Sequence, residues 1–168
     1  MIKKYKAFLK DEKRTVDVDV IFFETEVVKV TDNNFYQFEE VYLMQSTGAH
    51  DDTKFEDLKL KEKIEWLKSG KTEKDWKGRE IFEGDIVKSI YNSEIFTGVV
   101  VYDLSETDYK STSGQENYGH EFIYLTGNDS NEVVGNMYEN HRIMERGLGW
   151  GVNWHEKFWN RPRKLNRP

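Results

Sequence analysis

The sequence predicts a mainly β fold that contains one inserted α-helix. Residues 15–23 alternate apolar and polar side chains with a period of two, which is typical of a half-buried strand. Residues 53–69 are rich in lysine, glutamate and leucine, with apolar side chains at helical spacing. Short apolar runs separated by turn residues fill residues 79–145. We therefore expect an N-terminal antiparallel meander packed with a C-terminal SH3-like small barrel, plus the inserted helix at about 53–69 and a short C-terminal helix.

The meander is expected to occupy residues 1–48. Within residues 15–23, four apolar side chains are expected on the buried face: Val16, Val18, Val20 and Phe22. Asp17 and Asp19 are expected on the opposite face. Further strands are expected at residues 5–9, 26–30 and 35–45. None of these runs contains proline, so each of them can take a place in a sheet.

A helical insert is expected at residues 49–76. Thr53 and Glu56 have the spacing of a capping box at the start of the helix, and Gly70 is a natural end. Phe55 and Trp66 fall on roughly the opposite side from an apolar stripe, which consists of Leu60, Ile64 and Leu67. A helix that is apolar on two sides usually packs on both, so one side is expected on the protein's own body. The other side either contacts a second subunit or carries large side chains that simply project beyond the helix without a packing partner.

The barrel is expected at residues 77–146. Its strands are expected at residues 86–91, 95–102, 120–126 and 132–138, with a Ser/Thr/Gly-rich loop at 105–119. Gly84 is expected to take a positive φ at the turn that enters the barrel, and Asp85 to accept hydrogen bonds from backbone amides there. The meander and the barrel are expected to share one core, because each half alone is near the lower size limit for independent stability.

Three segments together resemble the YopX family of phage and prophage proteins. They are Leu43-Met-Gln-Ser-Thr-Gly48, Trp76-Lys-Gly-Arg-Glu-Ile-Phe-Glu-Gly-Asp-Ile-Val-Lys88 and Val134-Gly-Asn-Met-Tyr-Glu-Asn140. The resemblance implies a mostly β fold with a barrel-like C-terminal part, a tendency to form homo-oligomers, and no assigned catalytic residues. The chain departs from the family pattern through the helix inserted between His50 and Lys74 and through the extension at 147–168. Residues 1–146 are therefore interpreted as a single YopX-like β domain.

Composition excludes several classes of protein. The chain has no cysteine, which rules out a disulfide scaffold, a thiol nucleophile and cysteine-ligated zinc. Charged residues make up 33%, but the two signs are interspersed and aromatic residues reach 14%, so a folded domain is expected. No apolar stretch approaches the roughly 18 residues of a membrane helix. The N-terminus lacks the apolar core of a signal peptide, so we expect a cytoplasmic protein of the bacterial host cell without membrane contact.

No arrangement of residues predicts catalysis. The chain has no nucleophile-elbow, phosphate-loop or dinucleotide motif. Its four histidines lack metal-ligand or catalytic spacing: His50, His120, His141 and His155. Asp17 and Asp19, with Glu24 or Glu26, could hold a hard cation, but acids on the solvent side of an amphipathic strand are common. We therefore expect no catalytic residue, no metal and no cofactor.

The C-terminal extension, residues 147–168, is aromatic and basic. Asn153 could cap a short helix at 154–160, which Pro162 would end. Residues 155–168 carry a charge of +4, and because the whole chain carries −6, residues 1–154 carry −10. The candidate contact residues for a partner or nucleic acid are Trp150, Trp154, Phe158, Trp159, Arg161, Arg163, Lys164 and Arg167. Three interpretations stay open: base stacking with phosphate binding, anchoring in a neighbouring subunit, or packing back on the chain's own core.

These observations lead to an expected function in binding. We expect a non-enzymatic phage-type protein that acts as a homo-oligomeric scaffold or protein-interaction module, with a host or phage protein as a possible partner. The alternative is a nucleic-acid-binding module that uses the SH3-like barrel and the basic aromatic tail. The acidic body, at −10, disfavours strong binding to nucleic acid.

Overall fold

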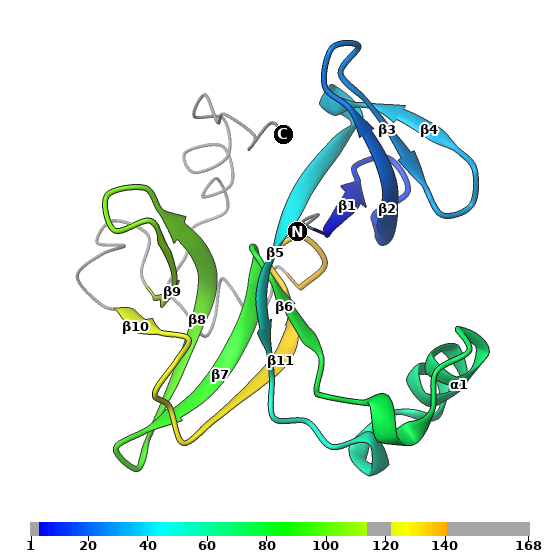
Figure 1. Ribbon diagram of the computed structural model, residues 1–168. Helices are drawn as coiled ribbons and strands as arrows, with labels where there is room; N and C mark the ends of the chain where they lie inside the picture. Colours follow the sequence, from blue (N-terminus) through cyan, green and yellow to red (C-terminus); the bar gives the residue numbers. More distant parts are fainter. Residues whose placement is uncertain (1–3, 114–121, 141–168) are drawn as a thin grey trace.

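The computed structural model describes residues 4–113 and 122–140, which form two antiparallel sheets and one α-helix (Figure 1). The prediction of a mainly β fold is confirmed. The first sheet has six strands in the order β4-β3-β2-β1-β5-β6. These strands are β1 (Tyr5–Leu9), β2 (Arg14–Phe22), β3 (Val27–Val30), β4 (Phe35–Gln37), β5 (Val41–His50) and β6 (Glu80–Phe82). The second sheet has five strands in the order β10-β9-β8-β7-β11. These are β7 (Asp85–Tyr91), β8 (Glu94–Asp103), β9 (Asp108–Thr112), β10 (Phe122–Tyr124) and β11 (Ser130–Asn136).

The expected meander is confirmed for β1 to β4, which follow one another both along the chain and across the sheet. The single strand expected at residues 35–45 is wrong, because a 3-10 turn at Phe38–Glu40 (η1) divides it. β4 ends before this turn, and β5 crosses to the other side of β1, where Leu43 pairs with Ala7. As a result, β1 lies in the middle of the sheet.

A β-bulge changes which residues of β2 are buried. The register between β2 and β3 shifts between Val18 and Val20. Val16 and Val18 pack on the core as expected, but Ile21 takes the next inward position. Val20 and Phe22, which were expected inside, are exposed. An extra residue in a strand turns every following side chain to the opposite face, so simple alternation is wrong beyond Val18.

The second sheet does not confirm an SH3-like barrel. Within residues 4–113 and 122–140 the sheet is open, because no ladder joins its edge strands β10 and β11. β7 and β8 lie where strands were expected, and β10 lies within the expected run 120–126. β9, in contrast, falls inside the region expected to be a loop, where Lys110 pairs with Val101 of β8.

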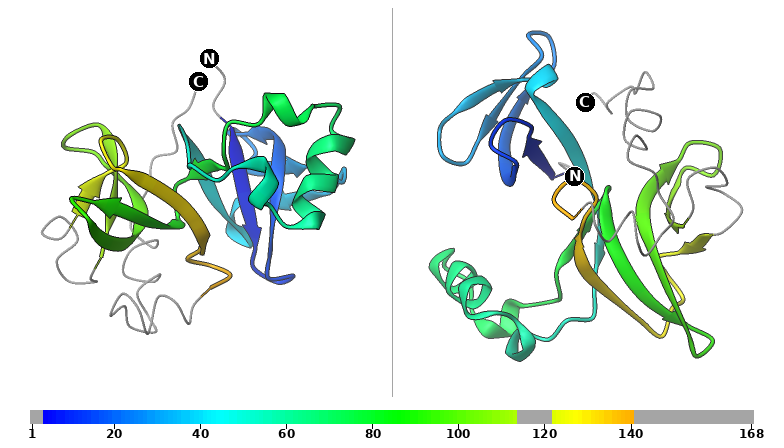
Figure 2. Two further views of the ribbon diagram at one scale, coloured as in Figure 1. Left: turned by 90° about the horizontal axis from the view of Figure 1, so that it is seen from below. Right: turned by 180° about the vertical axis from the view of Figure 1, so that it is seen from behind.

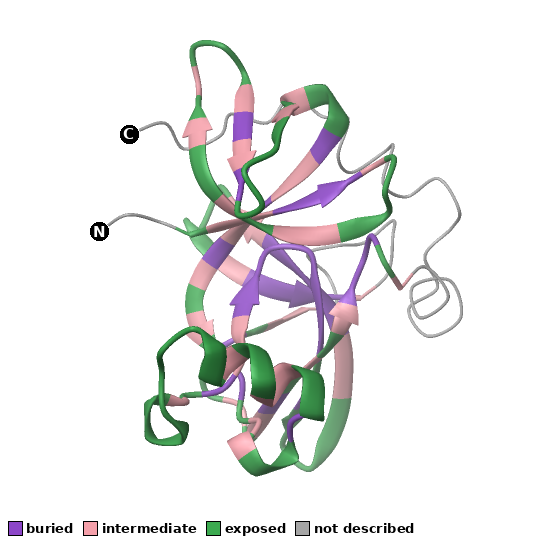
Figure 3. Ribbon diagram, turned by 90° about the vertical axis from the view of Figure 1, so that its right-hand side faces the viewer, coloured by how far each residue is buried: buried purple, intermediate pink, exposed green. Residues whose placement is uncertain are grey.

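One core connects the two sheets, as expected. Tyr138 packs in a cluster with two rings of the first sheet, with centroid distances of 5.3 Å to Phe8 and 4.7 Å to Tyr42. The buried residues of this core come from both sheets and from the end of β11: Phe8, Met44, Phe82, Ile86, Val99, Val101, Met137 and Tyr138. In Figure 3 the buried residues gather where the two sheets meet. The first sheet also has its own apolar cluster around Leu9 and Val28, and a third cluster, around Ile81 of β6 and Val100 of β8, again contains residues of both sheets.

The helical insert begins later than expected. A 3-10 turn at Phe55–Asp57 (η2) comes first, and the helix α1 spans Leu60–Lys68. The capping box expected at Thr53 is wrong, since the N-cap residue of α1 is Lys59, which makes no side-chain cap. The expected end is confirmed, because Ser69 is the C-cap and Gly70 has a φ of +84°. A second 3-10 turn, Glu73–Asp75 (η3), leads back to β6.

α1 lies outside both sheets in all views (Figures 1 and 2), and none of its residues is buried. No helix among the described residues is both long and apolar enough to span a membrane. The expected C-terminal helix at 154–160 lies outside the described residues.

Candidate functional site

Residues of all three motif segments meet where the sheets join. Gly84 has a φ of +94°, and a Cβ added there would lie 3.1 Å from the Met137 sulfur and 3.5 Å from the Met44 sulfur. Its carbonyl accepts a hydrogen bond from the Met137 amide at 2.9 Å. The positive φ expected for this glycine is confirmed. Since Met44, Gly84 and Met137 come from the three different motif segments and pack together in one junction, these segments have a structural role.

Asp85 plays the turn role expected from the sequence. Its carboxylate accepts a hydrogen bond from the Phe82 amide at 2.8 Å, which closes the β6–β7 turn. The side chain is buried, and burial raises its pKa to about 7, although the Phe82 amide and Lys6 both favour the charged form. Asp85 therefore changes charge near neutral pH.

The last motif segment ties β11 to the meander. The Glu139 carboxylate accepts a hydrogen bond from the Thr15 amide of β2 at 2.8 Å. The Asn136 side-chain oxygen accepts from the amides of Tyr138 and Glu139, at 3.0 and 2.8 Å, and so fixes the turn that follows β11. These polar residues satisfy backbone groups and connect the two sheets.

Asp51 is the polar centre at the base of the insert, and its side chain is fully buried. One carboxylate oxygen accepts from the amides of Thr53 and Arg79, at 3.1 and 2.7 Å. The other accepts from the Thr53 hydroxyl and the Val133 amide, each at 2.9 Å. Asp51 thereby connects the end of β5, the start of β6 and the edge of β11. The neighbouring Asp52 extends this edge contact with a hydrogen bond from the Asn131 amide at 2.7 Å.

Arg79 links this centre to α1. Its guanidinium forms a two-point contact with Glu62 of α1, at 2.9 and 3.1 Å, and lies 3.7 Å from the Asp51 carboxylate. The same guanidinium lowers the pKa of Glu62. A planar fork of this kind fixes orientation as well as distance, so α1 is held in a defined position.

An aromatic cluster supports the other side of the insert. Trp76 packs edge-on against Trp66 at 4.9 Å and against Phe55 at 6.3 Å. The Trp76 indole N–H donates to the Thr53 carbonyl at 2.8 Å, and the Trp66 indole N–H donates to the Thr72 carbonyl at 2.8 Å. Phe55 and Trp66 thus meet through Trp76, which the helical spacing alone did not indicate.

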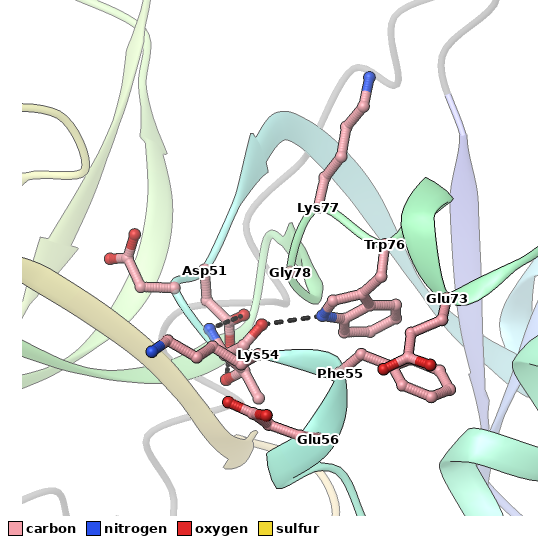
Figure 4. Close-up of a pocket in the computed structure, with 10 residues that line it drawn as sticks. Asp51, Lys54, Phe55, Glu56, Glu73, Trp76, Lys77 and Gly78 are labelled. Carbon is pink, nitrogen blue, oxygen red and sulfur yellow. Dashed lines mark hydrogen bonds between the residues drawn. The ribbon is translucent and has the colours of Figure 1, made fainter.

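A depression of about 450 Å³ lies beside this cluster (Figure 4). We call it the Trp76 depression. Its lining residues are Asp51, Asp52, Thr53, Lys54, Phe55, Glu56, Glu73, Trp76, Lys77 and Gly78. Its volume is within the range of pockets that hold small ligands or single side chains.

Gly78→Ala tests the close approach at the base of this depression. Gly78 has a φ of +105°, and an added Cβ would lie 1.9 Å from the Asp51 carbonyl oxygen. Strain and steric clash together are expected to lower the free energy of unfolding by about 3 kcal/mol or more in urea denaturation. Gly70→Ala is the matched control, since Gly70 also has a positive φ but open space around it. The control should lose about 1 kcal/mol, and equal losses in the two variants would contradict the close approach.

α1 turns its apolar stripe away from the body. Trp66 packs on the aromatic cluster, but the stripe residues Leu60, Ile64 and Leu67 are 73%, 42% and 52% exposed. The side expected to pack on the protein's own body is therefore the Trp66 side. The stripe contacts nothing that buries it within the part of the chain that the structure describes.

A second polar centre, which the sequence did not indicate, surrounds Lys110 of β9. Its ammonium lies 2.8 Å from Asp103 and 2.7 Å from Glu106, and 4.0 Å from the centre of the Phe122 ring. The side chain is only 6% exposed. Hydrogen bonds from this ammonium lower the pKa of both carboxylates. The cation is thus held by acids and an aromatic face together.

The remaining candidates from the sequence are placed as follows. All eight contact residues of the C-terminal extension lie outside the described residues, as do His120, His141 and His155. His50 is exposed at the end of β5. Asp17 and Asp19 are exposed on β2. Across residues 4–113 and 122–140, no three histidine, aspartate or glutamate side chains gather closely enough to hold a metal ion.

Comparison with known proteins supports the family resemblance. Residues 69–145 match the family model described as YopX protein. A crystal structure of protein EF1440 from Enterococcus faecalis is similar over 86% of this chain and 99% of that chain, with a TM-score of 0.48 and 17% sequence identity. No curated protein matches the chain.

Proposed function

Because residues 69–145 match the family model described as YopX protein, we propose that this chain is a YopX-like protein and a non-enzymatic scaffold of phage or prophage type. It works by binding, in the cytoplasm of the bacterial host, and it assembles as a homo-oligomer through α1. Host or phage proteins are the partners that such a scaffold would serve.

The exposed stripe of α1 carries this proposal. An amphipathic helix normally buries its apolar face, but Leu60, Ile64 and Leu67 all remain exposed. Packing the stripe against a second copy would bury these three side chains.

The attachment of α1 suits this role. The two-point contact between Arg79 and Glu62 and the packing of Trp66 on Trp76 hold the helix from its opposite side. The stripe is therefore presented in a fixed orientation, which lowers the entropic cost of association. Two copies related by a twofold axis would pair the stripes with each other.

The strength of this contact follows from the number of side chains that it would bury. Six partly exposed side chains from two copies would each contribute roughly 1 kcal/mol on burial. Association costs an estimated 4–15 kcal/mol, about as much as this gain or more. The stripe alone therefore supports weak, concentration-dependent association, and a tight oligomer requires contacts in addition to it.

The use of the motif residues supports the non-enzymatic part of the proposal. Gly84, Asp85, Asn136 and Glu139 are engaged in turns and in the junction between the sheets. A catalytic constellation would instead direct such groups toward an open cavity.

Ile64→Lys tests the proposal. The substitution places a charge in the middle of the stripe and is expected to weaken self-association at least about tenfold in sedimentation equilibrium. Lysine is a good helix former, so α1 itself should persist. Glu65→Lys is the matched control, since it adds the same side chain about 100° further round the helix. Self-association that is equally strong in wild type and Ile64→Lys would refute the role of the stripe.

The alternative function is nucleic-acid binding through an SH3-like barrel and the basic tail. Its support is the charge of +4 on residues 155–168, against −10 on the rest of the chain. We place it second because the acidic body repels phosphate groups.

A further inference from the structure

The Trp76 depression presents an aromatic surface that is fixed in place. Both indole N–H groups of the cluster are used internally, by the carbonyls of Thr53 and Thr72. The rings of Trp66 and Trp76 pack at 89° to each other, which leaves little freedom for either. A ligand that contacts this surface does not need to order it first.

Carboxylates line the same depression. Glu56 and Glu73 belong to its lining, are exposed, and form no ion pair with another residue in 4–113 or 122–140. Asp51, in contrast, is already engaged by backbone amides and Arg79. In Figure 4 the Lys77 side chain extends away from the rings. Once Asp51 is paired with Arg79, the remaining charged lining residues are three acids (Asp52, Glu56 and Glu73) and two lysines (Lys54 and Lys77), so the net charge of the lining is negative.

The chain holds two of its own lysines over aromatic rings, and one of these, Lys110, is also paired with carboxylates. Lys71 lies 4.5 Å from the centre of the Trp66 ring. Lys110 sits between Asp103, Glu106 and the Phe122 ring. Among the described residues, no lysine or arginine lies over the Trp76 ring. The depression thus offers the chemistry of a cation site that the described residues leave open.

We propose that the Trp76 depression binds an arginine side chain of a basic peptide. A guanidinium is flat and weakly hydrated, so it can stack on an indole face while its N–H groups donate to a carboxylate. Glu56 and Glu73 supply that carboxylate, and the Trp76 ring supplies the face. This site is separate from the apolar stripe of α1 and does not depend on self-association.

The test uses the full-length chain and a short peptide. The probe is Asn-Arg-Pro-Arg-Lys-Leu-Asn-Arg-Pro, which has the sequence of residues 160–168 and contains no aromatic residue. Binding is measured by calorimetry on the wild type and on a chain with Arg161, Arg163 and Arg167 replaced by glutamine, in which the arginines of residues 160–168 cannot compete with the peptide. Binding to at least one of the two chains is expected, and no binding to either overturns the proposal.

Variants of the depression locate the site. Trp76→Leu is expected to weaken binding at least about tenfold. Because Trp76 also supports the insert, the double variant Glu56→Gln/Glu73→Gln provides a second test that leaves the rings intact, with about a fivefold loss expected. Ile64→Lys, on the stripe, should bind the peptide as the wild type does. Unchanged binding by the double variant, or equal binding of a peptide with lysine in place of every arginine, would show that this site does not recognise arginine.

Discussion

Replacing Asp51 with alanine is expected to lower the free energy of unfolding by about 3–5 kcal/mol. The substitution removes the acceptor of the Arg79 and Val133 amides and of both donors of Thr53. It also leaves the Arg79 guanidinium without one of its carboxylate neighbours. Each buried donor that loses its partner adds its own desolvation cost, so the effect exceeds that of a single hydrogen bond.

Urea denaturation of the full-length chain measures this effect. Asp52→Ala is the matched control, because Asp52 is the next residue and its exposed side chain accepts from the Asn131 amide. The free energy of unfolding of the control is expected to fall by no more than about 1 kcal/mol. A loss for Asp51→Ala as small as that of the control would show that Asp51 is not the polar centre of the insert base.

Asp85→Asn is expected to remove a dependence of stability on pH. Burial raises the pKa of Asp85 in the folded protein to about 7, against an ordinary value of 3.8. The folded state therefore binds this proton more tightly than the unfolded state does. Stability from this group is fully present below the ordinary pKa and is lost as the pH rises through about 7. This difference between the two pKa values corresponds to a change of roughly 4 kcal/mol in the free energy of unfolding.

The measurement is the difference in unfolding free energy between wild type and variant from pH 4 to pH 8. Asparagine keeps the shape and can still accept from the Phe82 amide, so the two proteins should be similar in acid. At pH 8 the variant is expected to be the more stable one. Taking the difference cancels other carboxylates such as Glu62, whose pKa is lowered and whose contribution has the opposite sign. Parallel pH profiles would contradict the assignment to Asp85.

Local patterns predicted the elements whose residues carry a clear signal. β1 and β7 were predicted from apolar runs, and the turn at Gly84 and Asp85 followed from the conformational freedom of glycine and the acceptor capacity of aspartate. The end of α1 was predicted from Gly70, because glycine readily takes the positive φ that ends a helix.

Features that depend on distant partners were missed. The bulge in β2 is set by pairing with β3 and has no mark in the alternation of valines and aspartates. The sequence of β9 indicates a loop because its buried residues, Lys110, Ser111 and Thr112, are polar and are accommodated by tertiary contacts. Thr53 did not cap α1 because its hydroxyl donates to the Asp51 carboxylate instead.

The candidate site was only partly accessible to sequence reasoning. The stripe on α1 and the aromatic residues Phe55 and Trp66 were identified from helical spacing. Trp76 and Arg79 lay within the segment that resembled the YopX family, but their spacing along the chain gives no sign that they contact α1. Asp51-Asp52-Thr53 has the pattern of an aspartate turn, and this was the available signal for the polar centre.

The central claim is self-association through α1, and the solution mass of the full-length chain tests it most directly. Size-exclusion chromatography with light scattering would be run over a range of concentrations, with absorbance read at protein and nucleic-acid wavelengths. The account predicts that the mass rises above that of one chain, 20.0 kDa, as the concentration increases, and that the peak contains protein alone. A mass of one chain at every concentration would contradict it, and nucleic-acid absorbance in that peak would favour the alternative function.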